Sequence, residues 1–482
     1  MFDSNFTLRH LAAILLSLSI MLTFSNSFAA NAEIVSITGK GAQKPDGGRW
    51  SKAAVNDKVE EGGFVRTFAV SQMSLLLPNQ TQLKLNQNSQ MQIKTSGETA
   101  DWKKAKVNLV KGRAWSNARP VKTAKTKSSI KEPALTMDTP TVTLSIRGTI
   151  WEVEVGDDGT TQLVVLKGLV EMANEFGSVD VANGEAAIAE SGKAPVKMIL
   201  TNPERRVQWV TSWTPNPKRW LNANAQTEQK AIIDQINEGE IALAKQQLQQ
   251  QSKTNLDAAL ILADIALYQG QNTEAIELLK AFPGSPMALT LSGYALMHMD
   301  QIEALNSLLD HAMASYPDHL ELNILAGNVA IFEGEAKSAK NYFNKVAELY
   351  PESPWGWFGL GKIHTEKEYL REARHFLQMA MSQDPDFTKA QAELATLETY
   401  AGNLSASLRH FRDSLLNQPD DYVALTGQGI LQLKMGRTND ALNSFLKANM
   451  IEPRYARAWL YSAIAFYQLN DKTRSLEALQ QA

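Results

Sequence analysis

The stretch 351–385, PESPWGWFGLGKIHTEKEYLREARHFLQMAMSQDP, decides the fold of the larger part of this chain. It begins and ends with a proline, and prolines recur every 34 residues, at positions 317, 351, 385, 419 and 453. A fixed period of this length predicts a stack of similar helical pairs, each burying its apolar side against its neighbours. The small residues Gly361 and Ala373 would let the two helices of one pair cross closely, and each proline would end the second helix.

The units on either side follow the same register. Gly334, Gly402 and Gly436 occupy one equivalent position, which is the turn expected between the two helices of a pair. We expect six such repeats over residues 286–482 and degenerate helical repeats over residues 228–285.

One motif in the quoted stretch resembles the tetratricopeptide repeat (TPR). It reads W-x2-L-G-x2-H from Trp357 to His364, followed by A-x3-L from Ala373 and then by Pro385. The resemblance implies an all-α solenoid whose first helices line a concave groove that binds other proteins.

Positions that line the groove in this family identify candidate partner-binding residues here. They are Asn328, Ile331, Trp355, Phe358, Lys362, Lys389, Tyr400, Arg457 and Tyr467. Family members that grip a C-terminal carboxylate pair a basic residue with an asparagine, but Ile324 stands where the basic partner of Asn328 would be. An aromatic and aliphatic track of this kind would suit an extended peptide or an amphipathic helix. The alternative is that several of the apolar residues only pack between helices or against the β region.

Residues 1–29 have the composition of an export signal. Arg9 precedes an apolar run from Leu11 to Phe24, and Ala29 fits the cleavage site. The run is short for a membrane span. We therefore expect a periplasmic or secreted protein with no transmembrane segment in the mature chain, with an uncleaved inner-membrane anchor as the alternative.

The region 33–199 predicts an all-β domain. Short β-rich runs alternate with turn residues, and Asp157-Asp158-Gly159 is a hairpin turn between two of them. The predicted runs are Ala32–Thr38, Phe64–Thr67, Gln72–Leu77, Gln82–Leu85, Met91–Ile93, Lys106–Val110, Val142–Ile146, Trp151–Val155, Gln162–Val165 and Leu169–Met172. Many short strands of this kind favour an antiparallel β-roll, sandwich or barrel.

Two motifs in this region resemble the FecR domain. They are I-R-G-T-x-W at 146–151, which contains Arg147, Gly148 and Thr149, and V-V-L-K-G-L-V at 164–170. The named member of the family is a ferric-citrate signalling protein whose cytoplasmic segment touches a sigma factor. Only ten residues precede the apolar run here, too few to bind a sigma factor. The resemblance therefore implies a sensing or docking module outside the cytoplasm.

Charge differs between the two regions. Residues 1–227 carry a net charge of +7 and residues 228–482 a net charge of −10. The stretch 102–131 holds ten basic residues and no acidic one. Its candidate anion-binding residues are Lys111, Arg113, Arg119, Lys122, Lys125 and Lys127. They could contact anionic glycan, lipid head groups or the acidic solenoid, or could form only a solvated hairpin.

Catalysis, a metal site and a bound cofactor are not expected. The β region contains neither histidine nor cysteine, so it cannot hold a histidine-based triad or a common zinc site. The histidines of the helical region have no metal-ligand spacing, and His364 occupies a packing position of its repeat. The sequence also shows no recognised nucleic-acid-binding motif.

The junction 200–227 contains Trp209, Trp213 and Trp220, an unusual composition for a free tether. We expect these side chains to dock the β region onto the first helices. Taken together, the sequence predicts an exported, non-enzymatic interaction scaffold of the bacterial envelope. The alternatives are a ligand-sensing accessory acting through the FecR-like domain and a cell-wall glycan-binding protein.

Overall fold

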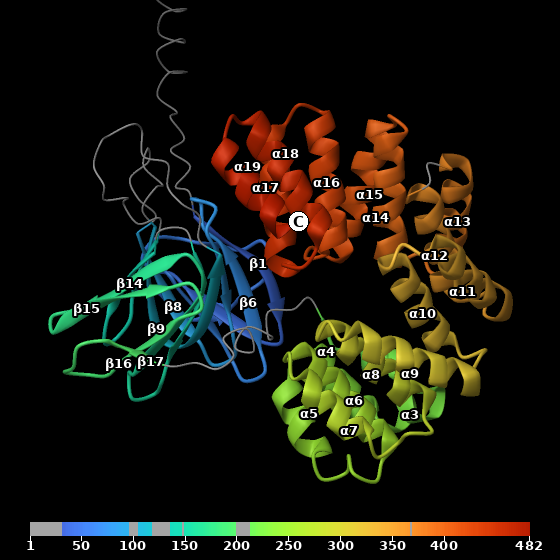
Figure 1. Cartoon of the computed structure of the whole chain (residues 1–482), viewed down its shortest axis with the longest axis horizontal. Helices are drawn as coiled ribbons and strands as arrows, with labels where there is room; N and C mark the ends of the chain where they lie inside the picture. Colours follow the sequence, from blue (N-terminus) through green and yellow to red (C-terminus); the bar gives the residue numbers. More distant parts are fainter. Residues whose placement is uncertain (1–30, 96–104, 118–134, 147–148, 199–212, 367–368) are drawn as a thin grey trace, which may run out of the picture.

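The structure, a computed structural model, describes residues 31–95, 105–117, 135–146, 149–198, 213–366 and 369–482. They form a strand-rich part up to residue 198, here the β-domain, and a helical part from residue 213, here the helical array (Figure 1). The expected fold class, an all-β domain followed by an all-α solenoid, is confirmed. No helix within the described ranges is both long and apolar enough to cross a bilayer. The expected export signal lies outside the described residues.

The strands of the β-domain are short apart from one. They are β1 (Ala32–Thr38), β2 (Gly41–Lys44), β3 (Ser51–Lys52), β4 (Lys58–Val59), β5 (Phe64–Thr67), β6 (Gln72–Leu76), β7 (Gln82–Leu85), β8 (Gln90–Thr95), β9 (Ala105–Asn117), β10 (Leu135–Asp138), β11 (Thr143–Ile146), β12 (Ile150–Val155), β13 (Thr161–Lys167), β14 (Leu169–Asn174), β15 (Gly177–Ala182), β16 (Ala186–Ala189) and β17 (Val196–Met198).

Two sheets share the long strand β9. One has the order β4-β1-β6-β7-β9-β12-β13-β16-β17, and the other β3-β2-β5-β8-β9-β10-β11-β14-β15. Among the described strands every pairing is antiparallel except that of β9 with β10. The facing sides of the two sheets bury one apolar core, in which Trp151 is fully enclosed. This is the sandwich-like arrangement that alternating apolar strands produce.

Strand β9 serves both sheets because it changes direction at Gly112. The residues before Gly112 pair with β8 and β10, and those from Gly112 onward pair with β7 and β12. Gly112 has a φ of 89°, and a Cβ at this position would lie 2.4 Å from the Cα of Ser89. Glycine is the residue that tolerates both the conformation and the contact.

The helical array consists of short helices followed by regular antiparallel pairs. They are α2 (Pro217–Trp220), α3 (Ala223–Glu228), α4 (Lys230–Asn237), α5 (Ile241–Leu248), α6 (Leu256–Tyr268), α7 (Asn272–Leu279), α8 (Pro286–His298), α9 (Ile302–Ser315), α10 (Leu320–Phe332), α11 (Ala336–Leu349), α12 (Pro354–Glu366), α13 (Leu370–Gln383), α14 (Thr388–Tyr400), α15 (Leu404–Asn417), α16 (Tyr422–Lys434), α17 (Thr438–Ile451), α18 (Ala456–Gln468) and α19 (Lys472–Gln481).

The repeated sequence features explain the packing of each pair. A small residue on the first helix receives a large one from the second: a Cβ on Gly429 would lie 2.3 Å from the ring of Phe445. The carbonyl oxygens of Pro317, Pro351, Pro385 and Pro453 accept hydrogen bonds from a side chain six residues later. The donors at this equivalent position are Asn323, Trp357, Gln391 and Trp459. These bonds hold the chain that enters each first helix, where a proline leaves the preceding helix without further backbone bonds.

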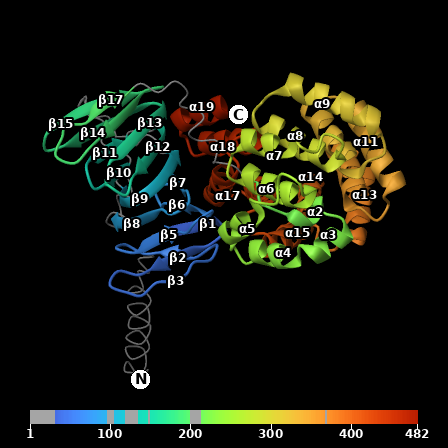
Figure 2. The same cartoon turned by 90° about the horizontal axis from the view of Figure 1, so that it is seen from below.

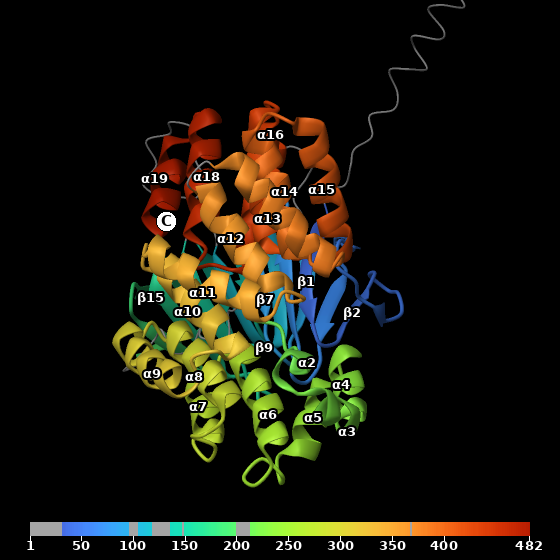
Figure 3. The same cartoon turned by 90° about the vertical axis from the view of Figure 1, so that its right-hand side faces the viewer.

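The array curves so that both of its ends lie beside the β-domain (Figures 1 and 2). At the first end, the Tyr268 hydroxyl on α6 donates to the Thr38 carbonyl over 3.4 Å. At the last end, α17 packs on β1, β6 and β7, and the Gln82 amide donates to the Leu446 carbonyl over 2.7 Å. Seen from the side of the array, the helices lie in front of β1, β7 and β9 (Figure 3).

The two ends of the array also touch each other. Arg454, in the turn before α18, donates to the His298 carbonyl at the end of α8 over 2.6 Å. The β-domain therefore rests against a nearly closed arc of helices, with contacts to both ends.

Candidate functional site

The first helices of successive pairs form one continuous surface, here called the inner face. Helices α6, α8, α10, α12, α14, α16 and α18 contact one another in this order. The candidate partner-binding residues predicted from the sequence belong to four of these helices, α10, α12, α14 and α18.

The junction segment, residues 213–221, crosses the inner face at its first end. The Trp213 indole N–H donates to Asp264 Oδ1 over 2.9 Å, and the Asn216 backbone N–H donates to Asp264 Oδ2 over 2.7 Å. Asp264 is fully buried in the middle of α6. Burial raises the pKa of Asp264 to about 7, although the hydrogen bonds from Trp213 and Asn216 oppose the shift.

Arg219 extends the junction further along the inner face. Its guanidinium binds both carboxylate oxygens of Glu321 on α10, with nitrogen–oxygen distances of 2.7–3.0 Å, and donates to the Tyr294 hydroxyl over 3.2 Å. The same guanidinium lies 4.7 Å from the ring centre of Trp355 on α12. Glu321 is buried, so each charge compensates the other in a site with little water.

The tryptophans of the junction pack against the helices. Trp213 stacks on Trp220 at 6.1 Å and contacts the rings of Tyr294 and His298 on α8. The β-domain shares this buried cluster through Val70. Trp209 lies outside the described residues. The junction thus fills the inner face of α6, α8 and α10 with its own side chains.

An aromatic cluster lies where the part of the inner face covered by the junction ends. Trp355, Phe358 and Phe387 meet edge to face, with ring centres 5.1–6.0 Å apart. Trp355 and Phe358 are half-buried, and Phe358 and Phe387 pack on the apolar core of α13 and α14. One side of Trp355 is covered by Arg219, so the two predicted aromatic anchors are only partly accessible.

The inner face beyond this cluster is open. Tyr400 is 37% exposed, and its hydroxyl accepts a hydrogen bond of 2.7 Å from Arg457 and lies 3.3 Å from the Tyr461 hydroxyl. On α18 an apolar line continues the surface: Leu460 is 42%, Ile464 39% and Tyr467 66% exposed. Tyrosine, arginine and apolar side chains in this combination are typical of protein-binding hot spots.

The remaining predicted groove residues are half-buried. Asn328 on α10 forms a side-chain hydrogen bond with the Tyr294 hydroxyl, and Ile331 packs on the core beside Phe343. Lys362 and Lys389 lie on α12 and α14 and are partly exposed. The structure spreads the predicted residues along the inner face and does not gather them into one pocket.

The basic stretch is divided between described and undescribed residues. Lys111 and Arg113 lie on β9, whereas Arg119, Lys122, Lys125 and Lys127 lie outside the described residues, as do Arg147 and Gly148. The charge of Arg113 is compensated by Glu152 at 2.9 Å and Glu154 at 2.8 Å. Lys111 is exposed, and Thr149 is buried beside β12.

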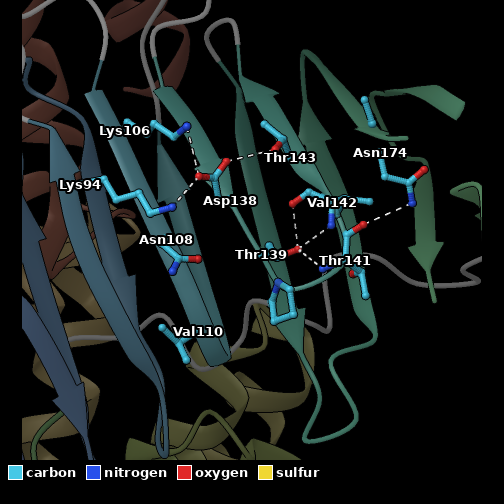
Figure 4. A pocket seen from close by; sticks show the side chains of 12 residues that line it. Lys94, Lys106, Asn108, Val110, Asp138, Thr139, Thr141, Val142, Thr143 and Asn174 are labelled. Atoms are coloured by element: carbon cyan, nitrogen blue, oxygen red, sulfur yellow. Dashed lines mark hydrogen bonds and ion pairs between the residues drawn. The ribbon is translucent and has the colours of Figure 1, made fainter. Parts of the chain in front are cut away.

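A polar groove of about 640 Å³ lies on the outer side of the β-domain (Figure 4). Lys94 and Lys106 both bind Asp138 Oδ2, at 2.9 and 3.2 Å, and the Thr143 hydroxyl donates to Asp138 Oδ1. Burial raises the pKa of the Asp138 carboxyl, but the bonds from the two lysines and Thr143 outweigh it and hold the pKa below its usual value. Asn174 closes the far side of the groove through the Thr141 carbonyl.

Sequence reasoning missed the charged residues that fix the junction. Asp264 stands in the otherwise apolar run of α6, and an acidic residue within such a run is a signal of a buried polar contact. Arg219 and Glu321 are 102 residues apart and carry no comparable local signal.

Family models match separate parts of the chain. A FecR protein model matches residues 64–171, and tetratricopeptide repeat models match residues 320–353 and 426–482. Both resemblances expected from the sequence are therefore confirmed. TPR repeats support a role in protein–protein interaction.

Curated relatives match only in part. Protein CTR9 homolog of Arabidopsis thaliana is 23% identical over 54% of this chain and 23% of its own length. Cellulose synthase 1 operon protein C of Komagataeibacter xylinus is 25% identical over 27% of this chain and 10% of its own length. The chain thus spans less than a quarter of either relative. A tetratricopeptide repeat protein of Parabacteroides merdae has a solved structure that covers 48% of this chain and 92% of its own, with 18% identity and a TM-score of 0.37.

Proposed function

We propose that this chain is an exported, non-enzymatic scaffold of the bacterial cell envelope that binds a protein partner along the open part of its inner face. The observation that carries the proposal is the exposed group of Tyr400, Leu460, Ile464 and Tyr467 on the first helices of the late repeats. Such a surface is larger than scattered single apolar residues, and neither the β-domain nor the junction covers it.

The partner would extend from this group toward the earlier repeats. Arg457 and Tyr400 supply hydrogen-bonding groups beside the apolar line of α18. The contact would continue over Lys389, Lys362 and the accessible edges of Trp355 and Phe358. It would end at Ile331 and Asn328. A peptide or a helix with apolar side chains at regular spacing fits a surface of this shape.

The test is crosslinking in intact cells, followed by capture of tagged protein. We expect wild type to capture a partner that a chain with Ile464→Ala and Tyr467→Ala loses, because truncation of hot-spot residues often costs about 2 kcal/mol or more each. The matched control is Leu408→Ala with Leu416→Ala, two residues of α15 that are 46% and 77% exposed. Equal capture by all three chains would place the contact elsewhere and refute the groove as the binding surface.

Export is tested separately. Chain isolated from the periplasm should begin at Ala30, which N-terminal sequencing reads directly. An intact Met1 on membrane-bound material would favour the inner-membrane anchor instead.

The polar groove of the β-domain favours a second candidate function, binding of an anionic glycan. Its lining combines Lys94, Lys106, Asn108 and threonine hydroxyls, the kind of groups that hydrogen-bond to sugars (Figure 4). Sedimentation with peptidoglycan tests it, and Lys122→Glu with Lys125→Glu tests whether the basic stretch takes part. Failure of the chain to sediment with peptidoglycan would remove this candidate.

A further inference from the structure

A second cavity lies where three parts of the chain meet. It has a volume of about 820 Å³, which is within the usual range for a small ligand or a short peptide end. One wall is the side of the β-domain formed by β2, β3 and β5, and Figure 2 shows these strands beside α4 and α5. The other walls are the α4–α5 turn, the junction at Thr214 and Pro215, and the α15–α16 turn.

Glycines bring the walls together. Gly39 and Gly239 stand in turns with φ of 78° and 82°, and a Cβ on Gly239 would lie 2.8 Å from the Gly39 carbonyl oxygen. Lys40 and Glu240, the residues that follow these glycines, form an ion pair across the same contact. The rim of the cavity is therefore fixed by backbone contact and a salt bridge.

The wall on the β-domain carries an arginine held between two rings. Side chains alternate along β5 and into the residue that follows it, so that Arg66 and Phe68 face outward while Val65 points into the core. The Arg66 guanidinium lies 4.1 Å from the ring centre of Trp50 and 4.9 Å from that of Phe68. The two rings hold the guanidinium in place; Nε is buried, whereas Nη1 and Nη2 remain for hydrogen bonding.

No carboxylate compensates this arginine within the described part of the chain. Arg66 forms no ion pair there, and its Nε is buried without a hydrogen-bond partner. Lys52 on β3 faces the same cavity, is exposed and also has no ion pair among the described residues. The uncompensated charges of Arg66 and Lys52 on one wall favour an anionic group in the cavity.

The facing walls have a different chemistry. The α4–α5 turn contributes Asn237 and Glu238, and the α15–α16 turn contributes Gln418 and Asp420. The carboxylates of Glu238 and Asp420 only accept hydrogen bonds, whereas the charged groups of Arg66 and Lys52 only donate them. Between them lie the apolar surfaces of Ile37, Pro215, Ile236 and Ile241.

We propose that this cavity binds the C-terminal end of a polypeptide. The terminal carboxylate would take the edge of Arg66 together with Lys52, because a planar carboxylate fits a guanidinium edge with two parallel hydrogen bonds. The last peptide N–H groups would donate to Glu238, Gln418 and Asp420 on the opposite walls. The last side chain would lie on the apolar surface between. This site is separate from the inner face, and the inference does not depend on the scaffold function.

The probes are two versions of one tripeptide, N-acetyl-alanyl-alanyl-leucine with a free carboxylate and the same peptide with a C-terminal amide. Isothermal titration of the purified chain should show binding of the free carboxylate, and the amide should bind at least about tenfold more weakly, because a charge-assisted bond is lost. Equal affinity for the two peptides overturns the proposal. So does equally tight binding of N-acetyl-leucine, which would assign the site to small carboxylic acids.

Two variants and a control locate the binding. Arg66→Gln and Lys52→Gln should each reduce affinity for the free-carboxylate peptide by about tenfold. Lys52 has no partner in the described chain, so its variant tests the site even if Arg66→Gln folds poorly. Lys472→Gln, an exposed lysine on α19, should bind as wild type does. Unchanged affinity in Lys52→Gln and in a folded Arg66→Gln chain refutes the site.

Discussion

The two ends of the inner face are built from the same repeat yet differ in what covers them. Across α6, α8 and α10 the junction places Trp213 and Arg219 against buried Asp264 and Glu321. Across α14 and α18 the equivalent surface is open and carries apolar residues such as Tyr467. A repeat fold offers a similar groove in every unit, and the contrast shows that the chain's own junction covers the first units and leaves the later ones exposed.

The junction covers one part of the inner face, here the filled half, and leaves the rest exposed, here the open half. Loss of the ion pair in the filled half should lower the free energy of unfolding far more than loss of any single charge in the open half. Arg219→Ala leaves the Glu321 carboxylate buried without its partner, so we expect the free energy of unfolding to fall by about 3–5 kcal/mol. Urea unfolding followed by circular dichroism measures it. Arg412→Ala, which removes an exposed ion pair, should change stability by less than about 0.5 kcal/mol.

A second substitution tests the cause of that loss. Adding Glu321→Gln to Arg219→Ala removes the uncompensated charge, so the double variant should be more stable than Arg219→Ala alone. A double variant as unstable as the sum of the two single losses would mean that packing, rather than buried charge, holds the junction.

The stability of the filled half should also depend on pH, because Asp264 changes its protonation state. Its pKa in the folded chain is about 7, above the value of about 3.9 for an unfolded chain, because it is buried. The folded state therefore binds the Asp264 proton more tightly than the unfolded state does. The stability that this proton contributes is fully present below about pH 4 and is lost as the pH rises through about 7. Between pH 5.5 and pH 8 we expect wild type to lose about 2 kcal/mol relative to Asp264→Asn.

His298, in the same region, makes the free energy of unfolding depend on pH in the opposite direction to Asp264. Burial lowers the pKa of His298 to about 4, so its contribution is lost as pH falls below about 6.5. Both chains of the comparison contain His298, so its effect cancels in the difference between them. Parallel pH profiles for wild type and Asp264→Asn would mean that Asp264 is ionised in the folded chain throughout this range.

Local patterns predicted the repeats and most of the sandwich. The proline period and the glycine positions predicted helical pairs because each contact is made within one unit or with its neighbour. The predicted runs at β1, β5 and β7 match the observed strands residue for residue. The hairpin predicted at Asp157-Asp158-Gly159 joins β12 and β13, with Gly159 at a φ of 81°.

These local patterns did not predict contacts between residues that are far apart in the sequence. Strand β10 is four residues long and pairs in parallel with β9, a partner that no local turn specifies. The ion pair of Arg219 with Glu321 and the cavity around Arg66 depend on how the array curves back to the β-domain. Curvature accumulates from small rotations between repeats, which single residues do not encode visibly.

The smallest change in stability is expected in the open half. Substitutions there should weaken partner binding and leave the free energy of unfolding almost unchanged. Ile464 and Tyr467 are exposed on α18, so Ile464→Ser and Tyr467→Ser should each change the free energy of unfolding by no more than about 0.5 kcal/mol. The same substitutions should abolish partner capture, because an exposed apolar line gains its energy only when a partner covers it. Urea unfolding of each variant beside wild type measures the first quantity. A loss of stability comparable to that of Arg219→Ala would show that this surface supports the fold, and the contrast between the two halves would then disappear.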